Sequence, residues 1–364
     1  MKTNERLYID FHVLQTVPPS CVNRDDTGAP KTAVYGGATR ARVSSQAWKR
    51  AIRMMFTERL PEEQVGKRTR NVLGLLAETI AARDASVNAE KLARDTLKDA
   101  GLTGKGKDKD KTSALFFISR AQLDALAGLA IVGEKDKKKL KAALNAAPAL
   151  DMALFGRMVV SDSKSELNLN IDAACQVAHA ISTHTVHNEY DYFTAVDDCA
   201  PQDNAGAGHL GTVEYNSATL YRYATINIGE LREKGLGMDI PSAVRVFADA
   251  FIHAMPTGKQ NTFANRTMPD FVYAALRTDQ PVNLAGAFEQ PIPASQEGYA
   301  RRSVERLTAY AGRVYESFAE APAAAYAASM VEMDSGFAAV MPVAKLLDAL
   351  ERDVAARLRD DEVM

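Results

Sequence analysis

Hydrophobic and polar positions alternate strictly in the first apolar segment of the chain, residues 7–14. One side of an extended strand would carry Leu7, Ile9, Phe11 and Val13. The other side would carry Tyr8, Asp10 and His12. This period of two predicts a β-strand that is buried on one face, with His12 on the outer face. Residues 18–31 are rich in Pro, Gly, Asn and Asp and predict a long loop.

The next segment, residues 44–60, has the period of a helix. Ser44 and Ser45 stand where an N-cap is needed. Positions i, i+4, i+7 and i+8 predict a buried stripe of Trp48, Ile52, Met55 and Phe56. A separate basic, amide-tipped face carries Gln46, Lys49, Arg50 and Arg53. The positive N-terminal end of this helix suits a phosphate, although an ordinary solvated basic face has the same pattern.

Residues 61–149 predict four helices, at 70–85, 88–101, 118–132 and 136–147, with a polar, glycine-rich loop at 101–113 between the second and third. This helical block separates strand-rich parts and is expected to be an insertion. Residues 171–187 predict a helix followed by an extended segment. Residues 192–198 and 213–228 predict the strands of a long hairpin with a protruding tip.

The C-terminal third is expected to be a loop and strand over 255–276 followed by helices. The last helix is amphipathic, with one face formed by Val343, Leu346, Leu347, Leu350, Val354 and Leu358. Lys259 and Arg266 make the loop basic. The pair Gly36 and Gly37, before the first helix, permits a tight turn and a close approach to a ligand.

Charge is distributed unevenly along the 364 residues, although the net charge is only −2. Residues 31–53 contain six basic residues and no acidic one, and residues 187–214 contain six acidic residues and neither Lys nor Arg. A basic and an acidic surface on one molecule would let copies stack head to tail. The N-terminus does not resemble a signal peptide and no apolar run could span a bilayer. We expect a cytoplasmic protein without a membrane partner.

Candidate chemistry is sparse. The three cysteines are far apart without CxxC spacing, and His179, His184 and His187 fit no standard zinc pattern. We therefore expect no metal or other cofactor, and no nucleotide-binding or hydrolase motif is present. Asp25 and Asp26 adjoin the basic stretch. Such a pair could hold Mg²⁺, but in a loop it more often caps a turn.

Several motifs in fixed order resemble one family. They are SCVNRDD, YGG, ARVSSQ and WKRAIR, followed by GRM, AHAISTH, DYFTAVDD, HLGTVEY, YRYATINI and GKQNTFA. Together they resemble the CasC-type (Cse-family) backbone subunit of type I-E CRISPR Cascade. The resemblance implies an α+β fold: a modified RNA-recognition (ferredoxin-like) palm, a helical fingers insertion and a β-hairpin thumb. The expected divisions are palm 1–60, fingers 61–155, palm 156–190, thumb 191–222 and palm 223–364.

The function that the resemblance implies is non-catalytic. Copies of the chain would polymerise as a hexameric filament along the spacer of a CRISPR RNA and present it for pairing with a target DNA strand. The other expected partners are the large, small, guide-processing and 5′-handle subunits of Cascade. The expected RNA contacts are Lys31, Arg42, Ser44, Ser45, Gln46, Lys49, Arg50, Arg53, Phe193, Thr194, Val196, Lys259 and Gln260. The expected DNA contacts are Lys137, Lys138 and Lys141.

Two alternatives remain open at the level of sequence. A related backbone subunit could cut a paired RNA target, with Asp25 or Asp26 and Mg²⁺ as its active site. A structural protein could also self-assemble without nucleic acid. A protein that holds a guide RNA needs to bind the sugar–phosphate backbone without reading its sequence, since base pairing with the target supplies the specificity.

Overall fold

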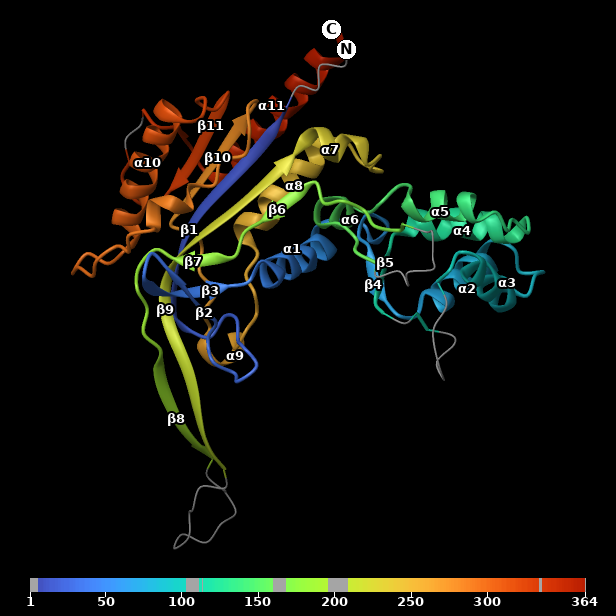
Figure 1. Ribbon diagram of the computed structural model, residues 1–364, viewed down its shortest axis with the longest axis horizontal. Coiled ribbons are helices and arrows are strands. Elements are labelled where there is room, and N and C mark those ends of the chain that lie inside the picture. The colour runs from blue at the N-terminus through green and yellow to red at the C-terminus, as the bar shows by residue number, and fades with distance from the viewer. Residues whose placement is uncertain are drawn as a thin grey trace, which may run out of the picture.

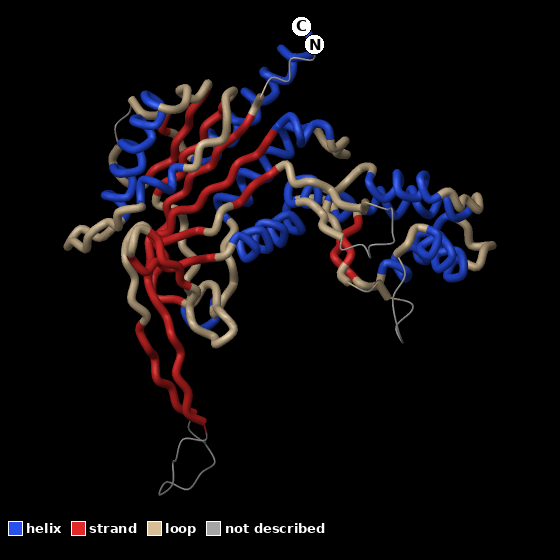
Figure 2. The backbone as a smooth tube through the Cα atoms, in the orientation of Figure 1, coloured by secondary structure: helices blue, strands red, loops and turns tan. Residues whose placement is uncertain are grey.

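The computed structural model describes residues 6–102, 111–112, 114–159, 168–195, 209–333 and 336–363. Ten of the strands in this part of the chain form one sheet (Figures 1 and 2). They are β1 (Tyr8–Ser20), β2 (Thr32–Tyr35), β3 (Ala38–Val43), β6 (Cys175–Val177), β7 (Ala180–Ser182), β8 (Glu189–Ala195), β9 (His209–Asn227), β10 (Phe271–Arg277), β11 (Ala324–Ser329) and β12 (Ala339–Val340). The order is β12-β11-β10-β1-β9-β7-β3-β2, and β6 and β8 also pair with β9. All pairs are antiparallel except β11 with β12.

Strand β1 lies in the middle of this sheet and is covered on both faces. Ile9 and Phe11 pack against α1 (Ser45–Arg59), α8 (Ile240–His253) and α11 (Val343–Val363). The opposite face packs against η3 (Leu284–Phe288) and α10 (Ala300–Ser317). The predicted strand is confirmed, but the prediction of one exposed face and of an outward His12 is wrong, because helices from the distant C-terminal part cover that side. His12 is fully buried.

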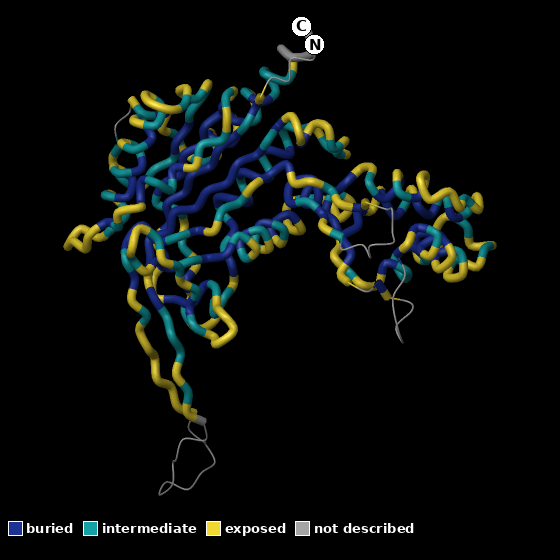
Figure 3. The backbone as a smooth tube through the Cα atoms, viewed as in Figure 1, coloured by how far each residue is buried: buried dark blue, intermediate teal, exposed yellow. Residues whose placement is uncertain are grey.

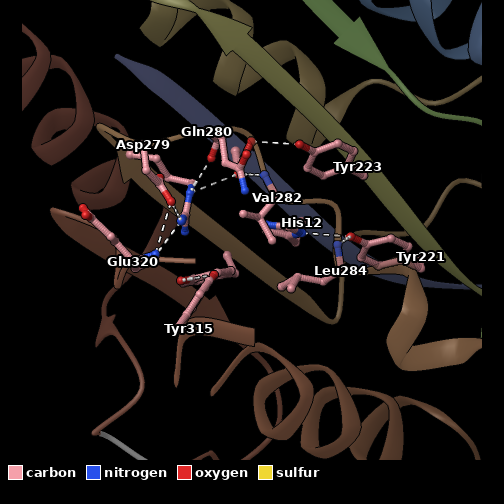
Figure 4. A network of polar contacts seen from close by, with 12 residues as sticks. His12, Tyr221, Tyr223, Asp279, Gln280, Val282, Leu284, Tyr315 and Glu320 are labelled. Atoms are coloured by element: carbon pink, nitrogen blue, oxygen red, sulfur yellow. Dashed lines mark hydrogen bonds and ion pairs between the residues drawn. The ribbon is translucent and has the colours of Figure 1, made fainter. Parts of the chain in front are cut away.

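A buried polar network occupies this second face (Figure 4). The Asp10 carboxylate accepts hydrogen bonds from the Tyr223 hydroxyl at 2.9 Å and from the Val282 amide at 2.8 Å. Nδ1 of His12 lies 2.9 Å from the Tyr221 hydroxyl. Arg277 lies within 4.0 Å of Asp10. These bonds satisfy polar groups that burial would otherwise penalise.

The helical insertion has a core of its own. The four predicted helices are confirmed as α2 (Val72–Arg83), α3 (Ala89–Asp99), α4 (Arg120–Ile131) and α5 (Lys137–Asn145). Their apolar faces meet in a cluster separate from the sheet's, which includes Leu76, Ile80, Leu97, Leu126 and Leu144. The sequence did not predict η1 (Glu62–Gln64), α6 (Leu150–Phe155) or the small sheet of β4 (Lys67–Thr69) and β5 (Phe116–Ile118). We call residues 61–155 the fingers; they project sideways from the body in Figure 1.

Two further predictions are wrong. Residues 171–187 contain β6 and β7 and no helix, because their short apolar runs pair with β9. The helix predicted at the start of this segment is therefore wrong. The C-terminal third contains β11 and β12 in addition to helices. The predicted strand at β10 and the final helix α11 are confirmed, and Leu346, Leu347, Leu350 and Val354 are buried. Short helices α7 (Ile228–Glu233) and α9 (Gln260–Phe263) complete this part.

The predicted hairpin consists of β8 and the first half of β9, and we call it the thumb. One half of β9 pairs with β1 inside the sheet, and the other half extends away from the body with β8. Every residue of β8 is exposed (Figure 3). Residues 196–208 lie outside the described residues, and with them Val196 and the acidic residues 197, 198 and 203. The predicted α+β fold class is confirmed. None of the helices described is long and apolar enough to cross a membrane.

Candidate nucleic-acid interface

Helix α1 forms where the sequence predicts it. Ser44 is the N-cap, and its Oγ accepts a hydrogen bond from the Ala47 amide at 3.3 Å. The buried residues of α1 are Trp48, Ile52, Met55 and Phe56, the stripe predicted from the period of 3.6. This packing turns the polar face of α1 outward, with Gln46 and Arg50 exposed and Lys49 half-buried. Ser44 itself is buried, so its predicted RNA contact competes with a structural role.

The loop before β2 is tied to the N-terminus of α1 by a single side chain. Asn23 accepts a hydrogen bond from the Ser44 amide on Oδ1 at 3.0 Å, and its carbonyl accepts one from the Lys31 amide at 2.8 Å. The Lys31 carbonyl in turn accepts from the Arg42 amide at 2.8 Å. These bonds bring Lys31, Arg42 and the start of α1 to one edge of the sheet, although they come from three different elements.

The six basic residues of 31–53 do not share one role. Arg40 is buried and donates to the carbonyls of Ser182 at 2.9 Å and Phe288 at 2.8 Å. Arg53 pairs with the buried Asp151 at 2.7 Å. The remaining four lie at the surface or are half-buried. We call these four, together with Ser45 and Gln46, the cationic edge: Lys31, Arg42, Ser45, Gln46, Lys49 and Arg50.

His179 belongs to this edge and was missed as a site residue. Its Nδ1 lies 3.3 Å from a guanidinium nitrogen of Arg42 and 3.4 Å from the Ser45 amide. Partial burial, with the charges of Arg42 and Lys31, lowers the pKa of His179. In a neutral ring that carries its proton on Nε2, the single lone pair of Nδ1 can accept a hydrogen bond from either neighbour. Its place between two predicted contacts is set by the pairing of β7 with β3, which the sequence did not reveal.

A hollow of about 880 Å³ lies beside the exposed side of α1. Its walls are the loop 22–28, the residues of α1 around Arg50, and the loop 254–258. Its lining contains equal numbers of basic and acidic residues: Arg24, Arg50, Arg266, Asp25, Asp26 and Glu58. Lys259 and Gln260 directly follow Gly258 of this wall, so the predicted contacts in the C-terminal loop lie close to those of α1. Arg24 was not predicted, although it stands in the SCVNRDD motif.

Asp25, the first residue of the acidic pair, stabilises its own loop. Oδ1 of Asp25 accepts hydrogen bonds from the Thr27 amide at 2.9 Å, the Thr27 hydroxyl at 2.7 Å and the Ala29 amide at 3.0 Å. The Thr27 hydrogen bond above all lowers the pKa of Asp25. Asp25 therefore caps a turn, one of the two predicted roles. Within the described residues, no three His, Cys, Asp or Glu side chains are grouped to hold a metal ion.

The turn between β2 and β3 explains the glycine pair. Gly36 has φ +58°, and a Cβ built there would lie 1.7 Å from the carbonyl oxygen of Glu289. The close approach predicted at this pair is therefore to the protein's own backbone. It holds the β2–β3 hairpin, and with it Arg42, against η3.

The thumb does not meet α1 of the same chain. In Figure 1 it extends away from the body, on the side opposite the chain termini. Phe193 faces Gly211 across the ribbon, and a Cβ at Gly211 would lie 2.3 Å from its ring. Phe193 is 40% exposed and Thr194 is exposed. The side chains of Phe193 and Thr194 therefore lie at the surface of this chain.

The lysines of the fingers lie at the start of α5, away from the cationic edge (Figure 1). Lys137 and Lys138 are exposed, and Lys141 is half-buried. Lys139, on the same helix, pairs with Glu134 at 2.5 Å. The predicted DNA contacts are therefore at the surface, and the structure does not bring them together with the predicted RNA contacts.

Comparisons with known proteins fit this geometry. The sequence model of the family described as CT1975-like protein matches residues 9–351. A chain of a solved "CRISPR RNA-guided surveillance complex, pre-nicking" is similar, with TM-score 0.80 and 32% identity over 95% of this chain and 99% of that chain. A chain of a solved "CRISPR RNA-guided surveillance complex" has TM-score 0.63 and 29% identity over 95% and 99%. No curated protein matches.

The family match extends from β1 into α11, and each of the two structural matches covers 95% of this chain. The predicted resemblance to subunits of CRISPR surveillance complexes is confirmed, since the solved neighbours are chains of such complexes. The assignment to the CasC-type subunit of type I-E stays a prediction. The chain belongs to the family of CT1975-like proteins.

Proposed function

We propose that this chain is a CRISPR RNA-binding subunit that polymerises along the guide to form the backbone of a type I-E Cascade complex. The observation that carries the proposal is the cationic edge, which lies at the N-terminus of α1 in a fold similar to chains of CRISPR RNA-guided surveillance complexes. The hydroxyl, amide side chain and four cations gathered there suit phosphates and sugars rather than base edges.

The cationic edge makes a quantitative prediction about salt. Lys31, Arg42, Lys49 and Arg50 would each neutralise one phosphate of a single strand. Each such contact contributes about −0.7 to the slope of log binding constant against log salt, so the proposed slope is about −3 per protomer. Such contacts read no sequence, which suits a guide whose sequence varies.

Polymerisation is supported by the thumb. A two-stranded ribbon has little stability alone, yet this one carries exposed Tyr190, Tyr192 and Leu210. We propose that a neighbouring copy covers the ribbon, with Phe193 and Thr194 placed against the bases of the guide. The acidic residues Glu189 and Asp191 would then approach the cationic edge of the neighbour. Six copies would form the proposed backbone, with the large, small, guide-processing and 5′-handle subunits bound around it.

The role of the fingers in this proposal is to hold target DNA. Lys137, Lys138 and Lys141 present ammonium groups that suit a phosphate backbone without reading sequence. The subunit is proposed to be non-catalytic, and the turn-capping role of Asp25 is consistent with that.

The experiment that tests guide binding is a double charge reversal, Lys49→Glu with Arg50→Glu. We expect the variant, co-expressed with its guide and partner subunits, to lose guide loading, because two phosphate contacts become repulsive. The matched control is Lys91→Glu with Lys98→Glu, which changes the net charge equally on exposed positions of α3. If both double variants load guide to the same extent, the assignment of Lys49 and Arg50 as phosphate contacts is rejected. A purified complex with the absorbance ratio of protein alone would favour the self-assembling structural protein.

A second experiment separates this proposal from RNA cleavage. The assembled complex is incubated with complementary RNA and Mg²⁺, and the products are separated by size. We expect intact RNA from the wild type and from Asp26→Ala. Regularly spaced cuts that disappear in Asp26→Ala would establish the enzyme instead.

A further inference from the structure

The joint between α1 and the fingers is built around Arg53. The chain leaves the sheet after α1, passes Gly66 into the fingers, and returns through α6. Nε of Arg53 donates to Oδ2 of Asp151 in α6 at 2.7 Å, and a second guanidinium nitrogen donates to the Gly66 carbonyl at 3.2 Å. Oδ1 of Asp151 accepts from the Gly66 amide at 2.9 Å. One ion pair therefore clamps both chain crossings to the helix that carries the cationic edge.

Phe117 of β5 completes the joint. Its ring lies between two guanidinium groups, with Arg53 at 4.6 Å and Arg68 at 4.7 Å from the centroid. A Cβ built at Gly66 would lie 2.4 Å from the same ring. The aromatic ring therefore packs directly on the backbone at the first crossing, and cation–π attraction holds it against α1.

The electrostatics make the contact hard to exchange for a phosphate. The Asp151 side chain is fully buried, and that of Arg53 is 18% exposed. Burial raises the pKa of the Asp151 carboxyl, and Arg53 opposes that rise. Taking Arg53 away would leave a buried carboxylate without this partner, which is costly in a low-dielectric interior. The two donors of the guanidinium also reach two acceptors at once, which an ammonium cannot do in the same geometry.

We propose that Arg53 and Asp151 are positioning residues that fix the fingers in one orientation relative to the cationic edge, and that Arg53 is not itself a phosphate contact. The inference rests on the proposed function, since it concerns how DNA held by α5 is aligned with a guide held by α1. The DNA and the guide stay aligned only if the joint between these two contact sites is rigid. The ion pair supplies that rigidity.

The test uses the assembled complex with Arg53→Gln, Asp151→Asn and, for contrast, Arg50→Gln. Three quantities are measured for each: the salt slope of guide binding, hydrogen exchange in β4, β5 and α6, and affinity for target DNA. We expect Arg53→Gln and Asp151→Asn to keep the wild-type slope, to speed exchange in those elements tenfold or more, and to weaken DNA binding about tenfold. Arg50→Gln is expected to reduce the slope by about 0.7 without changing exchange.

Asp151→Asn is the decisive variant, because it would release Arg53. If Arg53 were a phosphate contact restrained by Asp151, this variant would tighten guide binding and steepen its slope, and Arg53→Gln would reduce the slope. Either result overturns the proposal, as does unchanged exchange at the joint. Arg53→Lys keeps the positive charge but loses the paired hydrogen bonds of the guanidinium. It is expected to load guide normally, with hydrogen exchange and DNA affinity between those of the wild type and Arg53→Gln. Arg53→Lys replaces Arg53→Gln in the test if Arg53→Gln does not fold.

The outcomes separate the two proposals. An unchanged salt slope in Arg50→Gln would count against guide binding at the cationic edge. The hydrogen-exchange measurement tests the joint independently of guide binding. Loss of guide loading and DNA binding in equal measure by Arg53→Lys would show a merely structural role and would also overturn the positioning proposal.

Discussion

At the scale of the residue, one side-chain type serves three purposes within a short stretch. Arg40 supports the turn of η3, Arg53 fastens the fingers, and Arg50 faces the hollow. The sequence predicted the charge of all three but not their partners. Arg40 donates to the carbonyls of Ser182 and Phe288, and Arg53 pairs with the carboxylate of Asp151. These partners lie 98 or more residues away, so no local pattern could reveal them.

The buried His12 predicts a pH-dependent stability. Burial, with the charge of Arg277, lowers its pKa to about 3. In the unfolded chain it titrates near 6.5, so between these values the unfolded state binds a proton that the folded state does not. Stability from His12 is therefore present above pH 6.5 and is lost as pH falls toward 3. Urea unfolding of wild type and His12→Gln is expected to show their difference in free energy shrink by roughly 2–3 kcal/mol between pH 7 and pH 4.5.

Asp10 acts in the opposite direction and does not disturb this comparison. Burial raises its pKa to about 6, so its contribution to stability is present below 3.8 and is lost as pH rises through 6. Both proteins contain Asp10, and its contribution cancels in the difference. A difference that stays constant with pH would show that His12 titrates normally in the folded protein.

The pair Gly36 and Gly37 offers a matched test of the β2–β3 turn. Both have positive φ, but only Gly36 has a backbone neighbour where a Cβ would stand. Gly37→Ala is expected to cost about 1 kcal/mol of unfolding free energy from the left-handed conformation alone. Gly36→Ala should cost roughly 1–3 kcal/mol more, because the Glu289 carbonyl, which also accepts from Arg40, must move. Equal losses in thermal or urea unfolding would contradict this packing.

At the scale of the element, α1, α11 and the four helices of the fingers were predicted, whereas the short strands were not. The helices of the fingers and α1 bury one stripe each, and that stripe is visible in the sequence. Strands β6, β7, β11 and β12 have two to six residues, too few to show a period. Their conformation depends on pairing with distant strands. The face of β1 was misjudged for the same reason, since its second cover comes from α10.

The thumb carries a prediction about assembly. Phe193→Ala should weaken each guide-bound junction by roughly 1–3 kcal/mol, the cost of one lost stacking contact, and should leave the fold intact because the ribbon lies outside the apolar cores. Assembly is measured as the protein concentration needed to coat a guide of fixed length.

The control for the thumb is Tyr192→Ala. Tyr192 is exposed on the same strand and, as the adjacent residue, points to the other face of the ribbon. Unchanged assembly by Phe193→Ala would remove Phe193 from the interface. An equal loss in both variants would show that the ribbon is covered on both faces and that stacking is not specific to Phe193.

At the scale of the whole molecule, the candidate site is assembled from segments that the sequence could identify only separately. The cationic edge, the loop 255–266 and the SCVNRDD loop each have a recognisable composition, but the hollow between them depends on the sheet order. The same strand order places His179 and Arg24 at the site. The fingers and the thumb project from the body in different directions (Figure 1). The proposed filament requires that the cationic edge stay accessible to a continuous strand.

The measurement that tests the central claim most directly is the mapping of crosslinks between the guide and the protein in the assembled complex. Ultraviolet irradiation followed by peptide mass spectrometry locates the RNA on the chain. We predict crosslinks in peptides that contain residues 24–31, 42–50 and 255–266, together with the thumb around Phe193. Crosslinks confined to the fingers or to α10, with residues 42–50 unmodified, would contradict the account.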